Sequence, residues 1–339
     1  MLVAAACGSN GSVATPDTPV TVVAPDATGA TTTAPTTTGP TATAATSATT
    51  AARVVSPNGH AVIDDRGAEV HVASTERVIP LDGDVAEIVY ALGLGDRVVA
   101  TDLSATYPPA ADALPQIGYQ RALVAEPILA FEPTLLIATD LAGPPETLDD
   151  LERVGVPLVV VPDEATPTGA AEKILAVAEA LGVPDRGRTL AERVQGEIDA
   201  AIDTVADAPT GLRVATLYVR GSGTQLVLGE AYASHWLIEA AGAIDVADEL
   251  GVVESAPITD EAMLVAAPDV LLVPASGLES VGGVTGLLDA LPALARTPAG
   301  VAGAVLSYDD QLMLGNGPRA GSFLATLIAD LRDRAPTES

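Results

Sequence analysis

The sequence predicts an α/β protein built from two lobes that are joined by a long helical connection. Short runs that are almost wholly apolar alternate with helix-like runs between residues 77 and 162. A helical pattern then covers residues 168–206, and the alternation starts again after Pro209. Strands that are apolar throughout and separated by helices indicate a parallel sheet covered on both faces.

Residues 53–165 form the expected N-terminal lobe. It opens with a β-hairpin at 54–74, because apolar residues alternate on either side of a turn at Asp64–Gly67. The periodicity then predicts helices at 84–95, 125–132 and 146–155. The strands expected in this lobe lie at 77–81, 96–102, 133–139 and 156–162.

Residues 166–208 form the expected connection, and residues 209–339 form the C-terminal lobe. The connection is interrupted at Val183-Pro184, since proline begins a helix more readily than it continues one. In the second lobe a strand at 311–315 is expected to precede a closing helix at 320–334. The other alternating runs lie at 212–219, 235–242, 261–267, 269–274, 286–294 and 304–309.

A weak internal repeat links the two lobes. Glu126 opens a helix-like run, Pro133 follows seven residues later, and an apolar strand begins at once. Glu261 and Pro268 reproduce the same spacing in the second half. Either the lobes share a common plan or helix–proline–strand units recur by chance, and the matching glutamate, leucine and proline offsets favour the common plan.

The charge of the chain excludes several kinds of partner. Its 339 residues carry 16 Lys+Arg and 45 Asp+Glu, a formal net charge of −29, and Lys173 is the only lysine. Nucleic acid and anionic lipid headgroups need clustered positive charge, so neither is an expected partner. With 48% hydrophobic residues the chain can still bury a sizeable core.

The N-terminal segment predicts an anchor rather than a membrane-spanning helix. Small residues precede Cys7 and Gly-Ser follows it, a pattern that resembles a bacterial lipobox at residues 1–7. Too few residues precede Cys7 for the charged and apolar regions of a full signal peptide, and an incidental cysteine is the alternative. Residues 8–52 are rich in Thr, Ala and Pro and are expected to form a disordered stalk.

Motifs of common enzyme classes do not occur in the sequence. It has no G-x-S-x-G elbow, no P-loop and no His-x-x-x-His pair among His60, His71 and His235. The segment Gly315–Gly321, which contains Arg319, has the wrong glycine spacing for a dinucleotide fingerprint. It is either a carboxylate-binding helix N-terminus or a simple tight turn.

Two tyrosine–arginine pairs carry the most specific signal. Tyr119 and Arg121 precede the Glu126 helix, and Tyr218 and Arg220 end the first strand of the second lobe. Residues two apart in an extended chain point to the same face, and α/β sheets bind ligands beyond the carboxyl ends of their strands. A neighbouring guanidinium favours the phenolate form, which is a hard oxygen ligand for ferric iron.

From Arg77 to Arg334 the chain resembles hemin-binding substrate-binding lipoproteins of bacterial ABC importers, within the siderophore and cobalamin binding-protein group. The stretch at 117–138 has the pattern Gly-Tyr-x-Arg-x-Leu-x-x-Glu, and the segments LYVRG and LGNGPRAG are also typical. The resemblance implies two Rossmann-like lobes joined by a long backbone helix. It also implies that the protein is not an enzyme, and that haem b is a transported ligand.

The resemblance assigns roles to individual residues. Tyr119 and Tyr218 would be axial iron ligands with Arg121 and Arg220 beside them, and Arg319 would meet a haem propionate. Some members have histidine at one ligand position, whereas this sequence has tyrosine at both. The remaining implied roles are docking of an ABC permease dimer, with its ATPase, by Glu126 and Glu261, and lipidation at Cys7.

The expected function is therefore an extracytoplasmic, lipid-anchored haem receptor that delivers hemin to an ABC permease. A ferric-siderophore or cobalamin receptor is the nearest alternative, and an enzyme of nitrogenase-cofactor-like or chelatase-like fold is a more distant one. Tyr232 and His235 either face the ligand or serve packing. Because haem is itself anionic, we expect acidic residues on the outer helices and Arg121, Arg220 and Arg319 concentrated at the cleft.

Overall fold

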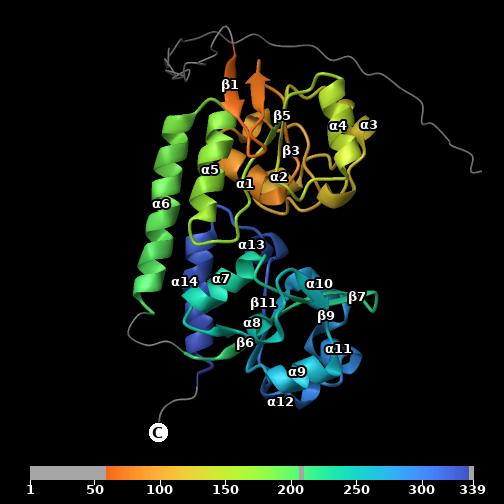
Figure 1. Ribbon diagram of the computed structural model, residues 1–339, viewed down its shortest axis with the longest axis vertical. Coiled ribbons are helices and arrows are strands. Elements are labelled where there is room, and N and C mark those ends of the chain that lie inside the picture. Colours follow the sequence, from red (N-terminus) through yellow and green to blue (C-terminus); the bar gives the residue numbers. More distant parts are fainter. Residues whose placement is uncertain (1–58, 206–209, 336–339) are drawn as a thin grey trace, which may run out of the picture. The chain divides into compact units, whose positions relative to one another are not determined.

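A three-stranded sheet in the N-terminal lobe and a six-stranded sheet in the C-terminal lobe organise the fold of this computed structural model (Figure 1). The structure describes residues 59–205 and 210–335, so Cys7 and the expected stalk at 8–52 lie outside the described residues. Residues from Val54 to Ser339 belong to one compact unit, which contains both sheets. No helix in the described ranges is long and apolar enough to cross a membrane.

The sheet of the N-terminal lobe has three parallel strands, all buried. Their order is β3 (Val78–Pro80), β4 (Leu135–Ala138) and β5 (Leu158–Val160), and the antiparallel hairpin of β1 (His60–Ile63) and β2 (Glu69–Val72) precedes them as predicted. The helical elements of the lobe are α1 (Gly83–Ala91), η1 (Gly95–Arg97), α2 (Pro109–Asp112), η2 (Gln120–Ala122), α3 (Ala125–Leu129) and α4 (Pro145–Arg153).

The strand expected at 96–102 is wrong. The segment begins with the 3-10 helix η1, and Val98 and Thr101 each form only one isolated bridge. Thr101 donates its backbone N–H to Pro115 O and accepts from Ile117 N–H, which ties it to a loop instead of the sheet. The segment therefore touches β3 at a single bridge, between Val98 and Val78, and does not continue as a strand of the sheet.

The sheet of the C-terminal lobe has six strands and is mixed rather than parallel. Its order is β11-β10-β6-β7-β9, with β8 paired to β6, and β7 and β9 are antiparallel to their neighbours. The sequence interpretation missed the β6–β7 hairpin, although Gly221 and Gly223 flank its turn and Gly221 has a φ of 52°. The strands are β6 (Arg213–Arg220), β7 (Thr224–Leu228), β8 (Ile244–Asp245), β9 (Ser255–Pro257), β10 (Val270–Pro274) and β11 (Val305–Tyr308).

Short helices surround this second sheet. The strand expected at 311–315 is wrong, because Asp309 accepts a hydrogen bond from Leu312 N–H at 3.0 Å and starts a helix there. The helices are α7 (Ala233–Ala240), α8 (Val246–Leu250), α9 (Asp260–Ala266), α10 (Ala275–Ser280), α11 (Gly283–Ala290), η3 (Leu294–Arg296), α12 (Pro298–Ala302), α13 (Asp310–Leu314) and α14 (Ala320–Arg332).

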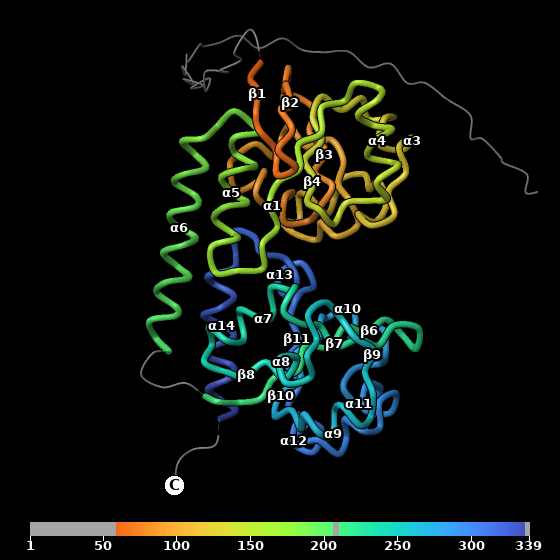
Figure 2. The backbone as a smooth tube through the Cα atoms, viewed as in Figure 1, coloured from red at the N-terminus to blue at the C-terminus, as the bar shows by residue number. Residues whose placement is uncertain are grey.

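A helical backbone joins the lobes. Helix α5 (Gly169–Ala180) and helix α6 (Pro184–Asp203) are separated at Val183-Pro184, and α6 packs against both α5 and α14 (Figures 1 and 2). With 20 residues, α6 is about 30 Å long, which suffices to run beside both lobes. The predicted α/β class with two lobes and a long backbone helix is confirmed.

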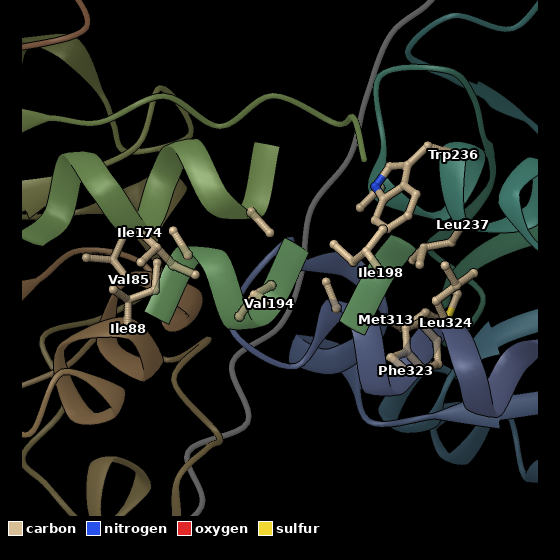
Figure 3. Close-up of a cluster of buried hydrophobic side chains, with 14 of the residues drawn as sticks. Val85, Ile88, Ile174, Val194, Ile198, Trp236, Leu237, Met313, Phe323 and Leu324 are labelled. Carbon is tan, nitrogen blue, oxygen red and sulfur yellow. The ribbon is translucent and has the colours of Figure 1, made fainter. Parts of the chain in front are cut away.

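One hydrophobic core extends through the backbone helices into both lobes (Figure 3). Ile88 of α1 and Ile174 of α5 lie at the end of the core in the N-terminal lobe, Val194 of α6 lies in its middle, and Trp236 and Phe323 lie at the end in the C-terminal lobe. Each of these side chains is at most 4% exposed. Because the core is continuous and close-packed, it resists motions that would separate the lobes.

Candidate ligand cavity

A cavity of about 880 Å³ lies between the lobes and takes its lining from both. This volume lies in the range of small-molecule and cofactor sites, about 300–1,000 Å³. Five leucines supply apolar surface, and three tyrosines supply amphipathic rings. These residues are Leu103, Leu141, Leu226, Leu228, Leu314, Tyr119, Tyr218 and Tyr232.

Strand β6 brings Tyr218 and Arg220 to the cavity together. Their spacing of two places both side chains on one face of the strand, and the guanidinium carbon of Arg220 lies 4.4 Å from the centroid of the Tyr218 ring. Arg220 also donates to Asp310 Oδ2 at 2.7 Å and to the carbonyl of Val219 at 3.0 Å. The arginine is therefore fixed over the ring by α13.

The pKa of the Tyr218 hydroxyl lies above its ordinary value. Burial raises the pKa, and the charge of Arg220 offsets only part of that effect. Arg220 therefore favours the phenolate as expected, but burial outweighs its charge, so the net shift of the Tyr218 pKa favours the protonated hydroxyl. A metal ion bound to the Tyr218 oxygen would have to supply the positive charge that displaces the hydroxyl proton.

Tyr119 and Arg121 reach the same cavity from a loop of the N-terminal lobe. Arg121 lies in the 3-10 helix η2, so the expected extended geometry is wrong here, yet both residues line the cavity. Gly143 N–H donates to Gln120 O and Leu123 N–H donates to Gly143 O, both at 2.8 Å, which holds the loop in place. Tyr119 is 41% exposed, so it lies at the mouth.

The two tyrosine–arginine pairs face a common space. The electrostatic environment of Tyr218 includes contributions from Tyr119 and Arg121 of the opposite lobe. The structure thus brings Tyr119, Arg121, Tyr218 and Arg220 together, while their roles as ligands of a bound molecule stay predictions. Tyr232, the residue before α7, also lines the cavity.

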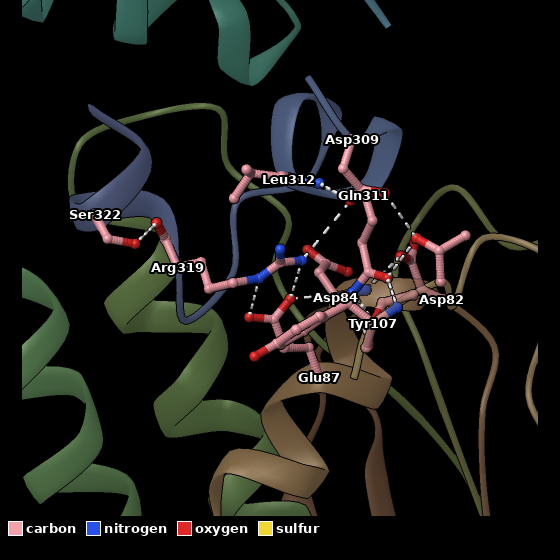
Figure 4. A network of polar contacts seen from close by, with 11 residues as sticks. Asp82, Asp84, Glu87, Tyr107, Asp309, Gln311, Leu312, Arg319 and Ser322 are labelled. Atoms are coloured by element: carbon pink, nitrogen blue, oxygen red, sulfur yellow. Dashed lines mark hydrogen bonds and ion pairs between the residues drawn. The ribbon is translucent and has the colours of Figure 1, made fainter. Parts of the chain in front are cut away.

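Arg319 does not line the cavity, contrary to the expectation that it meets a ligand carboxylate there. It donates through Nε and Nη2 to Glu87 of α1, each at 2.9 Å, and its guanidinium carbon lies 3.8 Å from the centroid of the Tyr107 ring (Figure 4). Its donors are directed to a 94% buried side chain of the other lobe. The preceding glycine-rich segment follows helix α13 rather than a strand.

Gln311 completes this contact between the lobes. Its Nε2 donates to the carbonyls of Gly83 and Tyr107 and to Glu87, at 2.8, 3.2 and 3.1 Å. Its Oε1 accepts from Tyr107 N–H at 2.8 Å. We call Glu87, Tyr107, Gln311 and Arg319 the interlobe base.

A buried acidic cluster forms the inner end of the cavity. Asp82 caps α1, Asp84 follows in its first turn, and Asp163 comes shortly after β5. Lys173 of α5 is fully buried and is ion-paired with both Asp84 and Asp163. Thr139 and Gln120 donate to Asp82 at 2.8 and 3.4 Å.

Burial and the lysine act in opposite directions on these groups. Burial raises the pKa of Asp82 and of Asp163. For Asp84 burial also acts to raise the pKa, but the charge of Lys173 and hydrogen bonds from Lys173, Asp82 and Asn316 together lower it to about 2. Burial alone would lower the pKa of Lys173, but the surrounding carboxylates raise it above its ordinary value. Lys173 and Asp84 therefore form a charged pair. The sequence interpretation missed this cluster, although a lone lysine in an apolar helix was a signal for it.

The expected distribution of charge is wrong. The cavity is lined by two arginines but by six acidic residues, so acidic groups are not confined to the outer helices. The acidic lining residues are Asp82, Asp84, Asp163, Glu279, Asp309 and Asp310. The concentration of arginine at the cleft is limited to Arg121 and Arg220.

Glu126 and Glu261 are both exposed, near the starts of α3 and α9. Six residues after each glutamate the backbone enters the left-handed region, at Glu132 with φ 46° and at Ala267 with φ 42°. Proline and the buried strand β4 or β10 follow in each case. The sequence repeat thus corresponds to the same helix–turn–strand corner in the two lobes.

An arginine stabilises each of these corners. Arg77 donates from Nε to the carbonyls of Phe131 and Glu132 at 3.0 Å, and Arg213 donates from Nε to Ala266 O at 2.8 Å. Arg77 immediately precedes β3, and Arg213 is the first residue of β6. The correspondence extends the repeat beyond what the sequence interpretation recognised.

His235 does not line the cavity. Its Nδ1 lies 3.2 Å from Oδ2 of the buried Asp245, and Glu239 and Asp248 lie within 3.5 Å of its ring nitrogens. These residues come from α7, β8 and α8. His235 therefore packs among acidic side chains of the second lobe, and Tyr232 is the member of this segment that lines the cavity.

Comparison with known proteins places these features in a family. A family model described as "Periplasmic binding protein" matches residues 78–312. Among curated proteins, a vitamin B12-binding protein of Vibrio parahaemolyticus is 33% identical over 129 residues, which cover 37% of this chain and 45% of that relative. The chain thus matches less than half the length of this curated relative.

Solved structures match over a larger share of both chains. The periplasmic heme-binding protein RhuT from Roseiflexus sp. RS-1, in its apo form, is 46% identical, with a TM-score of 0.75 over 78% of this chain and 100% of that one. The periplasmic heme-binding protein BhuT, in complex with two hemes, is 38% identical, with a TM-score of 0.71 and the same shares. The periplasmic heme-binding protein HutB of Vibrio cholerae is 30% identical, with a TM-score of 0.66 over 75% and 99%.

Proposed function

The chain belongs to the periplasmic binding protein family, and from this premise we propose that it is an extracytoplasmic receptor that binds haem between its lobes. Its relatives are binding components of transport rather than enzymes, and the function here is likewise binding and delivery. The observation that carries the proposal is the convergence of two tyrosine–arginine pairs, one from each lobe, on one cavity of about 880 Å³.

The chemistry of the lining suits an iron porphyrin. Tyrosine is an established axial ligand of haem iron, and Tyr119 and Tyr218 approach from opposite lobes. The five leucines offer apolar surface to the faces of a macrocycle. Because the pKa of Tyr218 is raised, ferric iron would provide the charge that stabilises its phenolate.

Cobalamin is the alternative cargo, since vitamin B12-binding proteins are among the relatives. Cobalamin gains nothing from two phenol ligands beside guanidinium groups, whereas ferric haem does. Relatives of greater identity and coverage are heme-binding proteins by title. Haem is therefore the favoured cargo of the two.

Delivery to an ABC permease dimer with its ATPase is part of the same proposal. Glu126 and Glu261 are exposed on equivalent corners of the two lobes, which suits a partner with two-fold related surfaces. The two acidic corners would pair with basic residues of such a partner. Cys7 would carry the lipid anchor that holds the receptor at the outer face of the membrane.

A hemin titration tests the cargo. Purified protein is titrated with hemin, and the visible spectrum is recorded for the wild type and for the variants Tyr119→Phe, Tyr218→Phe and the double variant. We expect a ferric tyrosinate spectrum that changes in each single variant and is lost in the double variant. A spectrum of free hemin throughout, together with binding of cyanocobalamin, would overturn the proposal in favour of the alternative.

A further inference from the structure

The cavity has an inner end and a mouth with different charges, and this difference bears on which porphyrins it accepts if haem is the cargo. The inner end holds Asp82, Asp84 and Asp163, of which Asp82 and Asp84 are 6% and 4% exposed. The mouth holds Tyr119, which is 41% exposed, and the exposed Arg121.

The hydrogen-bond donors at the inner end of the cavity already have partners within the protein. Lys173, the cation at that end, is fully buried and ion-paired with Asp84 and Asp163. Gln311 donates its amide hydrogens to Gly83, Glu87 and Tyr107. A carboxylate placed there would find these donors occupied.

Two acceptor oxygens at the inner end, in contrast, have no hydrogen-bond partner among the described residues. Within the described ranges, Oδ1 of Asp84 and Oε1 of Gln120 are buried and receive no hydrogen bond from the protein. Both residues line the cavity, and both are more than nine-tenths buried. The inner end therefore combines three carboxyl groups with a cation that is already paired, and among the described residues it offers an anion neither a free positive charge nor an unpaired donor.

The mouth has the reverse character. No carboxylate of the described residues lies within ion-pair distance of Arg121, so its guanidinium is available to a ligand. Arg220, the other lining arginine, is paired with Asp310. An anionic group at the mouth keeps part of its hydration and meets a free cation, whereas at the inner end it loses water and meets like charge.

We propose that the cavity admits an iron porphyrin with its carboxylate edge at the mouth, near Arg121, and its carboxylate-free edge at the acidic inner end. Asp84 and Asp163 are then specificity-determining residues, because they select against porphyrins that carry carboxylates on opposite edges. Protohaem has both propionates on one edge and fits this arrangement. Iron coproporphyrin III has propionates on both edges and does not.

The test compares three ligands on the wild-type protein by absorbance titration: hemin, hemin dimethyl ester and iron coproporphyrin III. We expect iron coproporphyrin III to bind at least about 30-fold more weakly than hemin, because one carboxylate must face the inner carboxylates. The ester, which lacks charge at the mouth, should bind within about fivefold of hemin, since an exposed ion pair contributes little.

A variant pair separates the inner end from overall charge. In the Asp163→Asn variant, iron coproporphyrin III should bind more nearly as tightly as hemin. The ratio of the hemin affinity to the coproporphyrin affinity should fall by at least about fivefold, because one like charge is removed. Asp149→Asn, which removes the same charge from an exposed position on α4, should leave that ratio at the wild-type value.

The outcomes are distinct. Iron coproporphyrin III binding within threefold of hemin, or an Asp163→Asn ratio equal to the wild-type ratio, would overturn the proposed orientation while the haem-receptor function stands. Failure of hemin itself to bind would overturn both.

Discussion

Two arginine–tyrosine stacks occur in the part of the chain that the structure describes, and one of the two faces the cavity. Arg319 lies over Tyr107 at 3.8 Å and Arg220 lies over Tyr218 at 4.4 Å, as measured from guanidinium carbon to ring centroid. Both arginines precede or follow glycine-rich turns, and both were expected to serve the ligand. The local geometry of the two stacks is alike, so it does not determine which arginine is available to a ligand.

The difference lies in their partners from the rest of the chain. Arg319 is held by two hydrogen bonds that it donates to a buried glutamate, Glu87, which lies 232 residues away in sequence. Arg220 has one carboxylate contact, with Asp310, and keeps its tyrosine exposed to the cavity. A pair of residues is thus available to a ligand only where the tertiary structure leaves its polar atoms uncommitted.

The largest expected effect on stability comes from the substitution Lys173→Met. The substitution leaves Asp84 and Asp163 buried without their cation, which should lower the free energy of unfolding at pH 7.5 by about 4 kcal/mol in urea denaturation. Arg193→Ala, which removes an exposed pair with Glu197 on α6, should cost only about 0.5 kcal/mol.

The same variant predicts a pH dependence. Without Lys173, burial would raise the pKa of Asp84 and Asp163 in the folded state above that in the unfolded state, so the folded state would bind more protons. Stability of the variant should then increase as the pH falls from 7.5 to 5, and its deficit relative to the wild type should shrink. A deficit that is constant over this range would contradict the assignment.

The substitution Arg319→Ala tests the interlobe base and has the next largest expected effect on stability. It leaves Glu87 buried and unpaired, so we expect a loss of about 3 kcal/mol in the free energy of unfolding. Since Arg319 does not line the cavity, the spectrum of the folded variant with hemin should match that of the wild type. A stable variant with an altered hemin spectrum would mean that Arg319 contributes to the ligand site after all.

The two tyrosines of the stacks can be compared by the same substitution. Tyr218→Phe should weaken hemin binding by about 30-fold, because it removes a ligand oxygen at the cavity. Tyr107→Phe keeps its ring beneath Arg319 and should leave the affinity within twofold. Equal effects of the two substitutions in hemin titrations would mean that the stacks do not differ in function.

The sequence predicted the parts of the fold that depend on local pattern. Buried parallel strands such as β4, the break at Pro184 and the hairpin β1–β2 follow from apolar periodicity and turn residues. The segment at 96–102 has the same apolar pattern, but it forms one bridge to β3 and then pairs through Thr101 with the loop at residues 115–117. Local pattern could not distinguish the two.

The candidate site was predictable only in part, for the same reason. The two tyrosine–arginine pairs were recognisable because each is a short motif. The acidic inner end joins Asp84, Asp163 and Lys173 from separate elements, and Glu87 joins Arg319 across the lobes. Such convergence is set by packing of distant segments, so charge counted along the chain predicted the wrong lining.

Arg121→Ala is the smallest expected effect and the finest test of the comparison between committed and available arginines. Arg121 is exposed and has no carboxylate partner among the described residues, so its contribution to hemin binding comes from a solvent-screened pair with a propionate. The substitution should weaken hemin binding by about threefold in 50 mM salt and by less in 500 mM salt, because ions screen exposed charges. It should have no effect on binding of the dimethyl ester, which carries no propionate charge. A loss that persists in high salt and with the ester would mean that Arg121 holds the loop of Tyr119 instead of meeting an anion.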